Sequence, residues 1–173
     1  MFRCLSNELS TPMTLICPEE NEHRLPATTF ASVIPSDSSG VPLTNDLNVS
    51  YFVGVDAAQT NPRWLLAGDH NLGSDGQITP THPFVQYPST YSPAFSVSLG
   101  TNFDPNGGVG WLDTMHSKQG NVVLADGSVS LYNRVQLQKA IRNSGDQGGN
   151  TSGPLFRNPV GCTGASLNRI QFP

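Results

Sequence analysis

The sequence predicts an α+β fold: a small antiparallel, hairpin-rich sheet of about four strands, one short helix and long loops, in a single domain spanning residues 1–173. Two β-rich runs around Asp126-Gly127 indicate a hairpin, and helical spacing follows them directly. The 17 Gly and 14 Pro interrupt regular elements and so predict the loops. A hydrophobic fraction of 36% with 13% charged residues is typical of a chain that folds around a core.

The N-terminal part of the chain predicts little regular structure. Leu5 to Leu9 indicate the end of a truncated helix, because Ser10-Thr11-Pro12 disfavours helical geometry. Met13 to Cys17 is apolar and is expected to form a short strand or a buried extended segment. Glu19 to Asp46 mixes charge, Ser and Pro without a period, which predicts a long irregular connection.

A first hairpin is expected after this connection. The run from Asn48 to Val55 is aromatic and β-branched, as a pleated strand requires. Turn-forming residues follow from Asp56 to Pro62, and the apolar run from Arg63 to Gly68 is expected to pair back as an antiparallel strand. From Asp69 to Gly110 the density of Gly, Pro, Ser and Asn predicts a second long loop region.

The strongest local pattern is the run from Gly120 to Tyr132. Asp126-Gly127 divides it into two strands, and this dipeptide favours the type I′ turn of a two-residue hairpin. Asn133 is the expected N-cap of a short helix over RVQLQKAIRN, which ends near Gly145. The tail from Asp146 onward returns to Gly, Asn and Pro and is expected to be irregular.

Charge and hydropathy exclude several classes of function. The net charge is −4 without a cluster of Lys or Arg, so nucleic-acid binding is not expected. No run of about 18 apolar residues is present that would span a bilayer. The cysteines Cys4, Cys17 and Cys162 lack CxxC spacing, which argues against a zinc site. One disulfide bridge and buried thiols both remain open for them.

The sequence contains no recognised catalytic, cofactor or metal motif. The four histidines, His23, His70, His82 and His116, lack the spacings of preformed metal sites. Nucleophile-elbow and phosphate-loop motifs are absent. Asp69 and His70 are neighbours, and neighbours in an extended chain point to opposite faces, so they are not expected to act as a pair. We therefore predict no catalytic residue, no cofactor and no metal; a hydrolase using Asp69, His70 or His116 is the least favoured alternative.

His116 and Asp126 are separated by nine residues, and their spacing favours a structural role. An extended run from Gly120 to Ala125 holds its ends roughly 20 Å apart, so the two side chains would lie at opposite ends of a strand. Asp126-Gly127 is then expected to make the turn, while His116 orders the loop that enters the strand.

The segment MHSKQGNVVLADGSVSLY resembles the H-X9-DG signature of prepilin-type proteins, the pseudopilin-like subunits of type II secretion and type IV pilus-like systems. The motif residues are His116, Gly120, Asn121, Asp126 and Gly127, and the resemblance assigns them structural roles. Further segments, LICP, SYFVGVDA and LLAGDHNL, are similar to one branch of this family. The resemblance thus covers most of the chain from Asn7 onward.

The resemblance implies a structural or accessory subunit rather than an enzyme. Its partners would be other pseudopilin or secretion-system subunits, at the cell envelope on the periplasmic or extracellular face of the inner membrane. Membrane anchoring is implied only if a hydrophobic helix precedes the helix end at Leu5 to Leu9. Major pseudopilins bind calcium in a loop that this sequence does not reproduce, so no metal is expected. The alternative is a secreted binding module or adhesin that recognises glycans or proteins, in which Tyr87, Tyr91 and Trp111 could stack on sugars.

Overall fold

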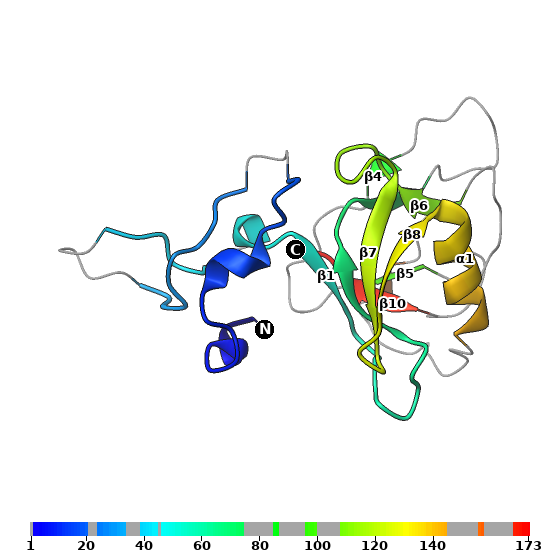
Figure 1. The fold of residues 1–173 in the computed structure, drawn as a ribbon, viewed down its shortest axis with the longest axis horizontal. Helices are drawn as coiled ribbons and strands as arrows, with labels where there is room; N and C mark the ends of the chain where they lie inside the picture. Colours follow the sequence, from blue (N-terminus) through cyan, green and yellow to red (C-terminus); the bar gives the residue numbers. More distant parts are fainter. Residues whose placement is uncertain are drawn as a thin grey trace.

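The computed structural model of the protein describes residues 2–20, 24–33, 39–44, 46–74, 85–86, 96–99, 108–144, 156–157 and 168–173. These residues contain one α-helix, ten strands and three short 3₁₀ helices. Figure 1 shows two parts, an N-terminal segment in blue and cyan and a β-sheet with the helix packed beside it. The predicted α+β class is confirmed.

The elements follow the chain in a simple order. The 3₁₀ helices are Phe2–Leu5, Pro12–Leu15 and Asp46–Asn48, and the α-helix is α1, Arg134–Asn143. The strands are β1 (Tyr51–Gly54), β2 (Leu65–Asp69), β3 (Leu72–Ser74), β4 (Val85–Gln86), β5 (Ser96–Ser98), β6 (Val109–Trp111), β7 (Gln119–Leu124), β8 (Val129–Asn133), β9 (Phe156–Arg157) and β10 (Arg169–Gln171).

The main sheet has seven strands in the order β8-β7-β2-β1-β10-β5-β9, and β4-β3-β6 form a second sheet. All neighbours in the main sheet are antiparallel except β5 and β9, which are parallel. The sheet exceeds the four or so strands expected because two segments predicted to be irregular contribute strands. The loop region predicted over Asp69–Gly110 supplies β5 and also contains β3, β4 and the start of β6, and the C-terminal tail supplies β9 and β10. Its strand β10 enters the middle of the sheet, where Gln171 pairs with Val53.

The first 3₁₀ helices replace the elements expected near the N-terminus. The helix predicted over Leu5–Leu9 is the 3₁₀ helix Phe2–Leu5 and one further turn, in which the Leu9 N–H donates to the Leu5 carbonyl at 2.8 Å. Met13 to Cys17 is not a strand, since Pro12–Leu15 is helical. Pro12 occupies the first helical position, where its fixed φ is favourable, and the Thr11 side chain accepts a hydrogen bond from the Met13 N–H.

Both predicted hairpins are present. In the first, β1 and β2 pair antiparallel, with Tyr51 opposite Asp69. In the second, β7 and β8 pair around Asp126-Gly127. The type I′ turn is wrong, because that turn requires a positive φ at both central residues and only Gly127 has one, at 84°. The Gly127 N–H donates to the Leu124 carbonyl at 2.9 Å, so the turn begins one residue earlier and ends on a left-handed glycine.

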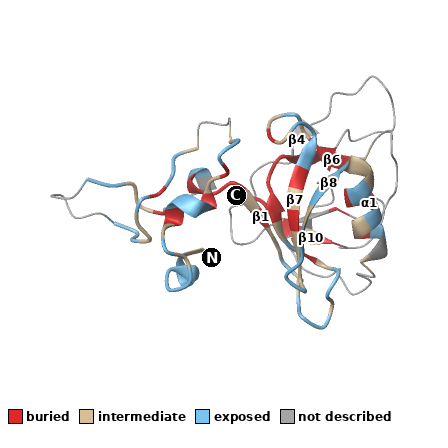
Figure 2. Cartoon of the chain, in the orientation of Figure 1, coloured by how far each residue is buried: buried red, intermediate tan, exposed pale blue. Residues whose placement is uncertain are grey.

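The predicted helix α1 closes one face of the main sheet. It begins at the N-cap Asn133, which exchanges hydrogen bonds with Gln136 in a capping box. Its buried face joins the main core, which consists of Phe52, Leu65, Leu72, Leu99, Val109, Trp111, Val122, Leu137, Ile141, Ile170 and Phe172. Figure 2 shows buried residues along the central strands that this core fills.

The N-terminal segment has a smaller core of its own. Leu15, Ala27, Leu43 and Val49 are buried there, and Tyr51 of β1 packs against them. The segment therefore rests on the sheet through the start of β1. No helix among the described residues has the length and apolar character that a membrane crossing requires.

Candidate functional site

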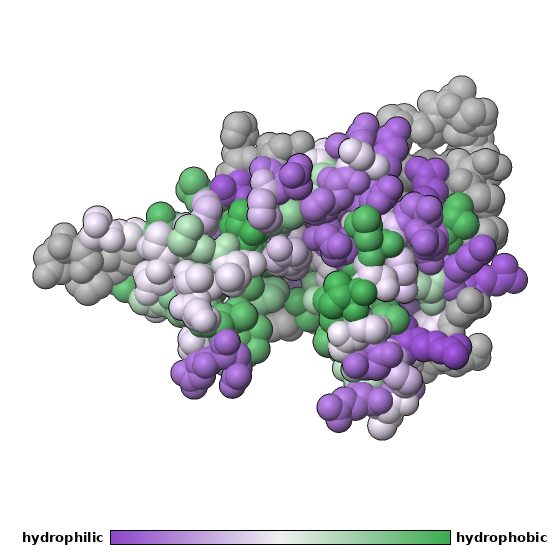
Figure 3. Space-filling view, in the orientation of Figure 1, coloured by the Kyte–Doolittle hydropathy of each residue, from purple (hydrophilic) through white to green (hydrophobic). Residues whose placement is uncertain are grey.

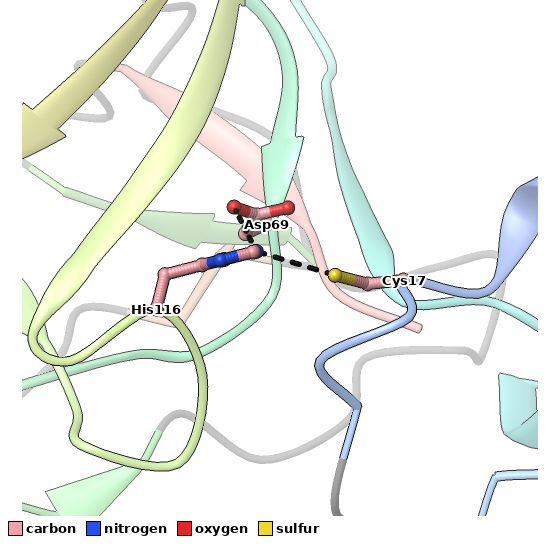
Figure 4. Close-up of side chains that lie close together, drawn as sticks. All are labelled: Cys17, Asp69 and His116. Carbon is pink, nitrogen blue, oxygen red and sulfur yellow. Dashed lines mark hydrogen bonds and ion pairs between the residues drawn. The ribbon is translucent and has the colours of Figure 1, made fainter.

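Three side chains meet where the N-terminal segment joins the sheet. Cys17 follows the 3₁₀ helix Pro12–Leu15, Asp69 ends β2, and His116 lies in the loop between β6 and β7. Sγ of Cys17 lies 3.2 Å from Nε2 of His116, and the same nitrogen lies 3.4 Å from Oδ2 of Asp69. Figure 4 shows the three groups pointing toward one another. Their ligand atoms all lie within 4.8 Å of one another.

Asp69 is held by β7. Its side chain is only 1% exposed, and Oδ2 accepts hydrogen bonds from the Asn121 backbone N–H at 2.6 Å and from Asn121 Nδ2 at 3.1 Å. Oδ1 is buried and has no hydrogen-bond partner among the described residues. Burial raises the pKa of Asp69, against the opposing effects of the Asn121 hydrogen bonds and of His116. The carboxyl group thus has one oxygen, Oδ2, that faces His116 and another, Oδ1, that is buried and unsatisfied within the described residues.

His116 is placed by an unusual backbone. Three consecutive residues other than glycine have left-handed φ values: His116 at 49°, Ser117 at 51° and Lys118 at 63°. The Gln119 N–H closes this turn on the His116 carbonyl at 3.2 Å. Left-handed geometry destabilises such residues by about 1–3 kcal/mol each, and strain of this kind clusters at functional sites. The loop therefore accepts strain in the conformation that presents the imidazole to Asp69.

Cys17 is a buried thiol whose setting does not suit a nucleophile. Burial raises the pKa of the Cys17 thiol, and the charges of Asp69 and Glu20 add to this effect. In a catalytic Cys-His-Asp arrangement the imidazole uses its two nitrogens for different partners. Here Nε2 of His116 faces both Cys17 and Asp69. The geometry therefore does not favour cysteine-based hydrolysis.

A second polar cluster lies next to this one. Oε2 of Glu20 accepts hydrogen bonds from the Ser50 hydroxyl at 2.7 Å and from Nε2 of His70 at 2.8 Å. Nε of Arg24 lies 3.2 Å from the same oxygen, and its NH2 donates to Nδ1 of His70 at 3.2 Å. The cluster is buried and fixes the N-terminal segment to the sheet.

Asp69 and His70 are neighbours in the chain but have different partners. The carboxylate of Asp69 faces His116, whereas His70 faces Glu20 and Arg24. Sequence reasoning missed that Cys17 and Asp69 join His116. The chain carries no local signal for this, since the contact between Cys17 and His116 spans 99 positions.

The other motif residues occupy β7 and its turn. Asn121 holds Asp69, and Gly120 lies against the ring of Trp111. Asp126 and Gly127 form the turn at the end of β7 remote from His116, and Oδ1 of Asp126 accepts hydrogen bonds from the N–H and hydroxyl of Ser128 at 2.9 and 2.6 Å. The motif residues thus shape one strand and both of its ends.

Trp111 is too buried to bind a glycan, as the alternative function would require. Its side chain is 2% exposed and belongs to the main core, so the ring presents no face for stacking on a sugar. Tyr87, Tyr91, Cys162, His23 and His82 lie outside the described residues.

Comparison with family models, with curated proteins and with solved structures found no match to this chain.

Proposed function

We propose that this chain is a structural, pseudopilin-like subunit of a type II secretion or type IV pilus-like assembly, acting through protein–protein contacts rather than by catalysis. The observation that carries the proposal is an exposed aliphatic surface on the edge strand β8. Val129 is 65% exposed and Leu131 is 51% exposed, although both lie in a regular strand. Aliphatic surface on a sheet edge is typical of strands that bind another protein.

The direction of these side chains follows from the strand's alternation. Tyr132 packs against the main core beside α1, so Val129 and Leu131 point to the face of the sheet that α1 leaves uncovered. Val129 pairs with Val123, and Val123 pairs with Ala67 on β2. An aliphatic row therefore crosses three neighbouring strands on this face. Figure 3 shows hydrophobic surface over β7 and beside it, with a further hydrophobic area on the N-terminal segment.

The H-X9-DG residues support the same proposal because they set the position of β8. His116 and Asn121 fix the start of β7 against Asp69. The turn at Asp126-Gly127 then returns the chain as β8 in register with β7. The motif thus stabilises the strand that carries the exposed surface. The motif therefore has a structural role, the positioning of β8, that needs no catalysis.

Site-specific photo-crosslinking in the organism that encodes the chain tests the proposal. A photoreactive residue at Leu131 is expected to capture subunits of a secretion or pilus-like assembly, identified by mass spectrometry. A matched probe at Lys139, exposed on α1, is expected to capture far less. If Leu131 yields no such subunit, or if both positions yield the same products, the proposed interface is wrong.

A further inference from the structure

We propose that Cys17, Asp69 and His116 form a binding site for a transition-metal ion, best suited to zinc, which ties the N-terminal segment to the sheet. The site shares His116 and Asp69 with the contacts that position β7, but it does not require that the chain join an assembly. Cys17 comes from the N-terminal segment, whereas Asp69 and His116 come from the sheet and its β6–β7 loop. One ion bound by all three would join parts of the chain that are remote in sequence.

The spacing of the three groups matches a common metal ion. Zinc binds sulfur at about 2.3 Å and nitrogen or oxygen at about 2.0–2.2 Å, so tetrahedral ligand atoms lie roughly 3.3–3.6 Å apart. The observed separations are 3.2 Å from Cys17 to His116 and 3.4 Å from His116 to Asp69. The third pair lies within 4.8 Å. Only a small adjustment of Cys17 and Asp69 is needed to surround one ion.

Hydrogen bonds alone do not satisfy this arrangement. Nε2 of His116 carries either one proton or one lone pair, so it cannot act as donor to Asp69 and acceptor from Cys17 at once. In either tautomer, either Cys17 or Asp69 is left without a favourable hydrogen bond to Nε2. A cation placed between the three groups interacts favourably with the nitrogen lone pair, the carboxylate and the thiolate together.

The carboxyl group of Asp69 is a second observation that points to a cation, because Oδ2 faces His116 while the buried Oδ1 on the same group is unsatisfied within the described residues. The Asp69 side chain is 1% exposed, and Oδ1 has no hydrogen-bond partner in the described part of the chain. A buried carboxylate oxygen without a partner is energetically unfavourable. The two hydrogen bonds from Asn121 fix the carboxyl group through Oδ2, as outer-shell groups commonly do for metal ligands.

The donor set decides the class of metal. Calcium and magnesium prefer oxygen ligands alone, whereas one thiolate, one imidazole and one carboxylate suit zinc and related ions. Binding converts the Cys17 thiol to a thiolate and releases its proton to solvent, without any change of oxidation state. Three protein ligands leave one position of a tetrahedral ion for water or another ligand.

Metal titration of the purified full chain tests the site. After removal of metals with a chelator, the chain is expected to bind one equivalent of Zn²⁺ by calorimetry. Co²⁺ should give a thiolate-to-cobalt charge-transfer band. His116→Asn removes the imidazole while keeping a residue that tolerates left-handed geometry. This variant and Cys17→Ser are each expected to weaken Zn²⁺ binding at least about 100-fold.

The control Cys4→Ser changes an exposed cysteine outside the cluster and is expected to bind like the unchanged chain. Binding of less than a tenth of an equivalent of Zn²⁺ by the unchanged chain would overturn the proposal. So would equal affinity in His116→Asn. Where Cys17→Ser fails to fold, the chain carrying both Cys4→Ser and Cys162→Ser decides, because Cys17 is then its one cysteine. A thiolate-to-cobalt band in it supports the site, and its absence rejects the site.

Discussion

Gly120 lies directly against the indole ring of Trp111, so that a β-carbon at Gly120 would come within 2.6 Å of Cε3 and 2.7 Å of Cη2. Gly120 belongs to β7 of the main sheet and Trp111 to β6 of the second sheet. The missing side chain at Gly120 therefore lets the two sheets share one core. The ring of Trp111 is 2% exposed and has no room to withdraw.

Gly120→Ala is expected to destabilise the fold by about 2–3 kcal/mol, because the added methyl overpacks the core against Trp111. The loss should appear as a lower denaturant midpoint in equilibrium unfolding. Gly120→Ala combined with Trp111→Leu is expected to destabilise less than the sum of the single changes. Strict additivity of the two changes would contradict the contact.

At Gly127, in contrast to Gly120, only the backbone conformation is expected to determine the effect of a substitution on stability. Its φ is 84°, and a β-carbon there would meet nothing within 4 Å. Gly127→Ala is therefore expected to destabilise by about 1 kcal/mol through left-handed geometry alone. Gly127→Asn should destabilise less than Gly127→Ala, because Asn tolerates this conformation better. Gly127→Asn is therefore expected to have the higher unfolding midpoint of the two variants. A higher midpoint for Gly127→Ala would contradict the role of left-handed geometry.

The parts of the fold that the sequence predicted are those determined by local chemistry. Asp126-Gly127 and the Asn133 cap act over a few residues, so the second hairpin and α1 were predictable. Strand β10 was not, because its place between β1 and β5 depends on the order of the whole sheet. Its sequence around Ile170 is too short to identify a partner strand.

In the candidate site too, local sequence predicted some features, whereas contacts between remote segments could not be predicted. Alternation along an extended strand predicts that Asp69 and His70 do not act as a pair, and in the structure they have different partners. It could not tell which side would meet His116 or Cys17, because those contacts need the loop before β7 to fold back over β2. The left-handed run that begins at His116 also lacks the glycine that marks such geometry.

In the strained turn beside the site, a substitution is expected to stabilise the fold, in contrast to the changes at Gly120 and Gly127. Lys118 is exposed with φ 63°, so Lys118→Gly removes a left-handed β-carbon and is expected to stabilise the fold by about 0.5–1 kcal/mol. The matched control Lys139→Gly, at an exposed position in α1, should destabilise by about 1 kcal/mol. Thermal unfolding of both variants checks the prediction. A lower melting temperature for Lys118→Gly would show that the turn is not strained there.

The buried cluster around Glu20 predicts a local effect of mutation. Arg24→Met removes a buried cation from Glu20 and His70 and is expected to destabilise by about 3–5 kcal/mol. Ser50→Ala removes one neutral donor from the same carboxylate and should destabilise by about 1–3 kcal/mol. Hydrogen exchange is expected to rise first in the N-terminal segment, before β7 opens. Equal exchange in both parts would show that the cluster does not attach that segment.

The turn at Asp126 gives a pH-dependent prediction. The hydrogen bonds from Ser128 lower the pKa of Asp126, although this side chain is exposed. A carboxyl group with a lowered folded-state pKa stabilises the fold above its unfolded pKa, and this stabilisation is lost as the pH falls through the folded value. NMR titration should therefore give Asp126 a pKa below the usual range. Ser128→Ala is expected to raise this pKa toward the ordinary value, because it removes the hydroxyl donor while leaving the backbone N–H in place. An unchanged pKa in Ser128→Ala would show that the hydroxyl does not hold the carboxylate.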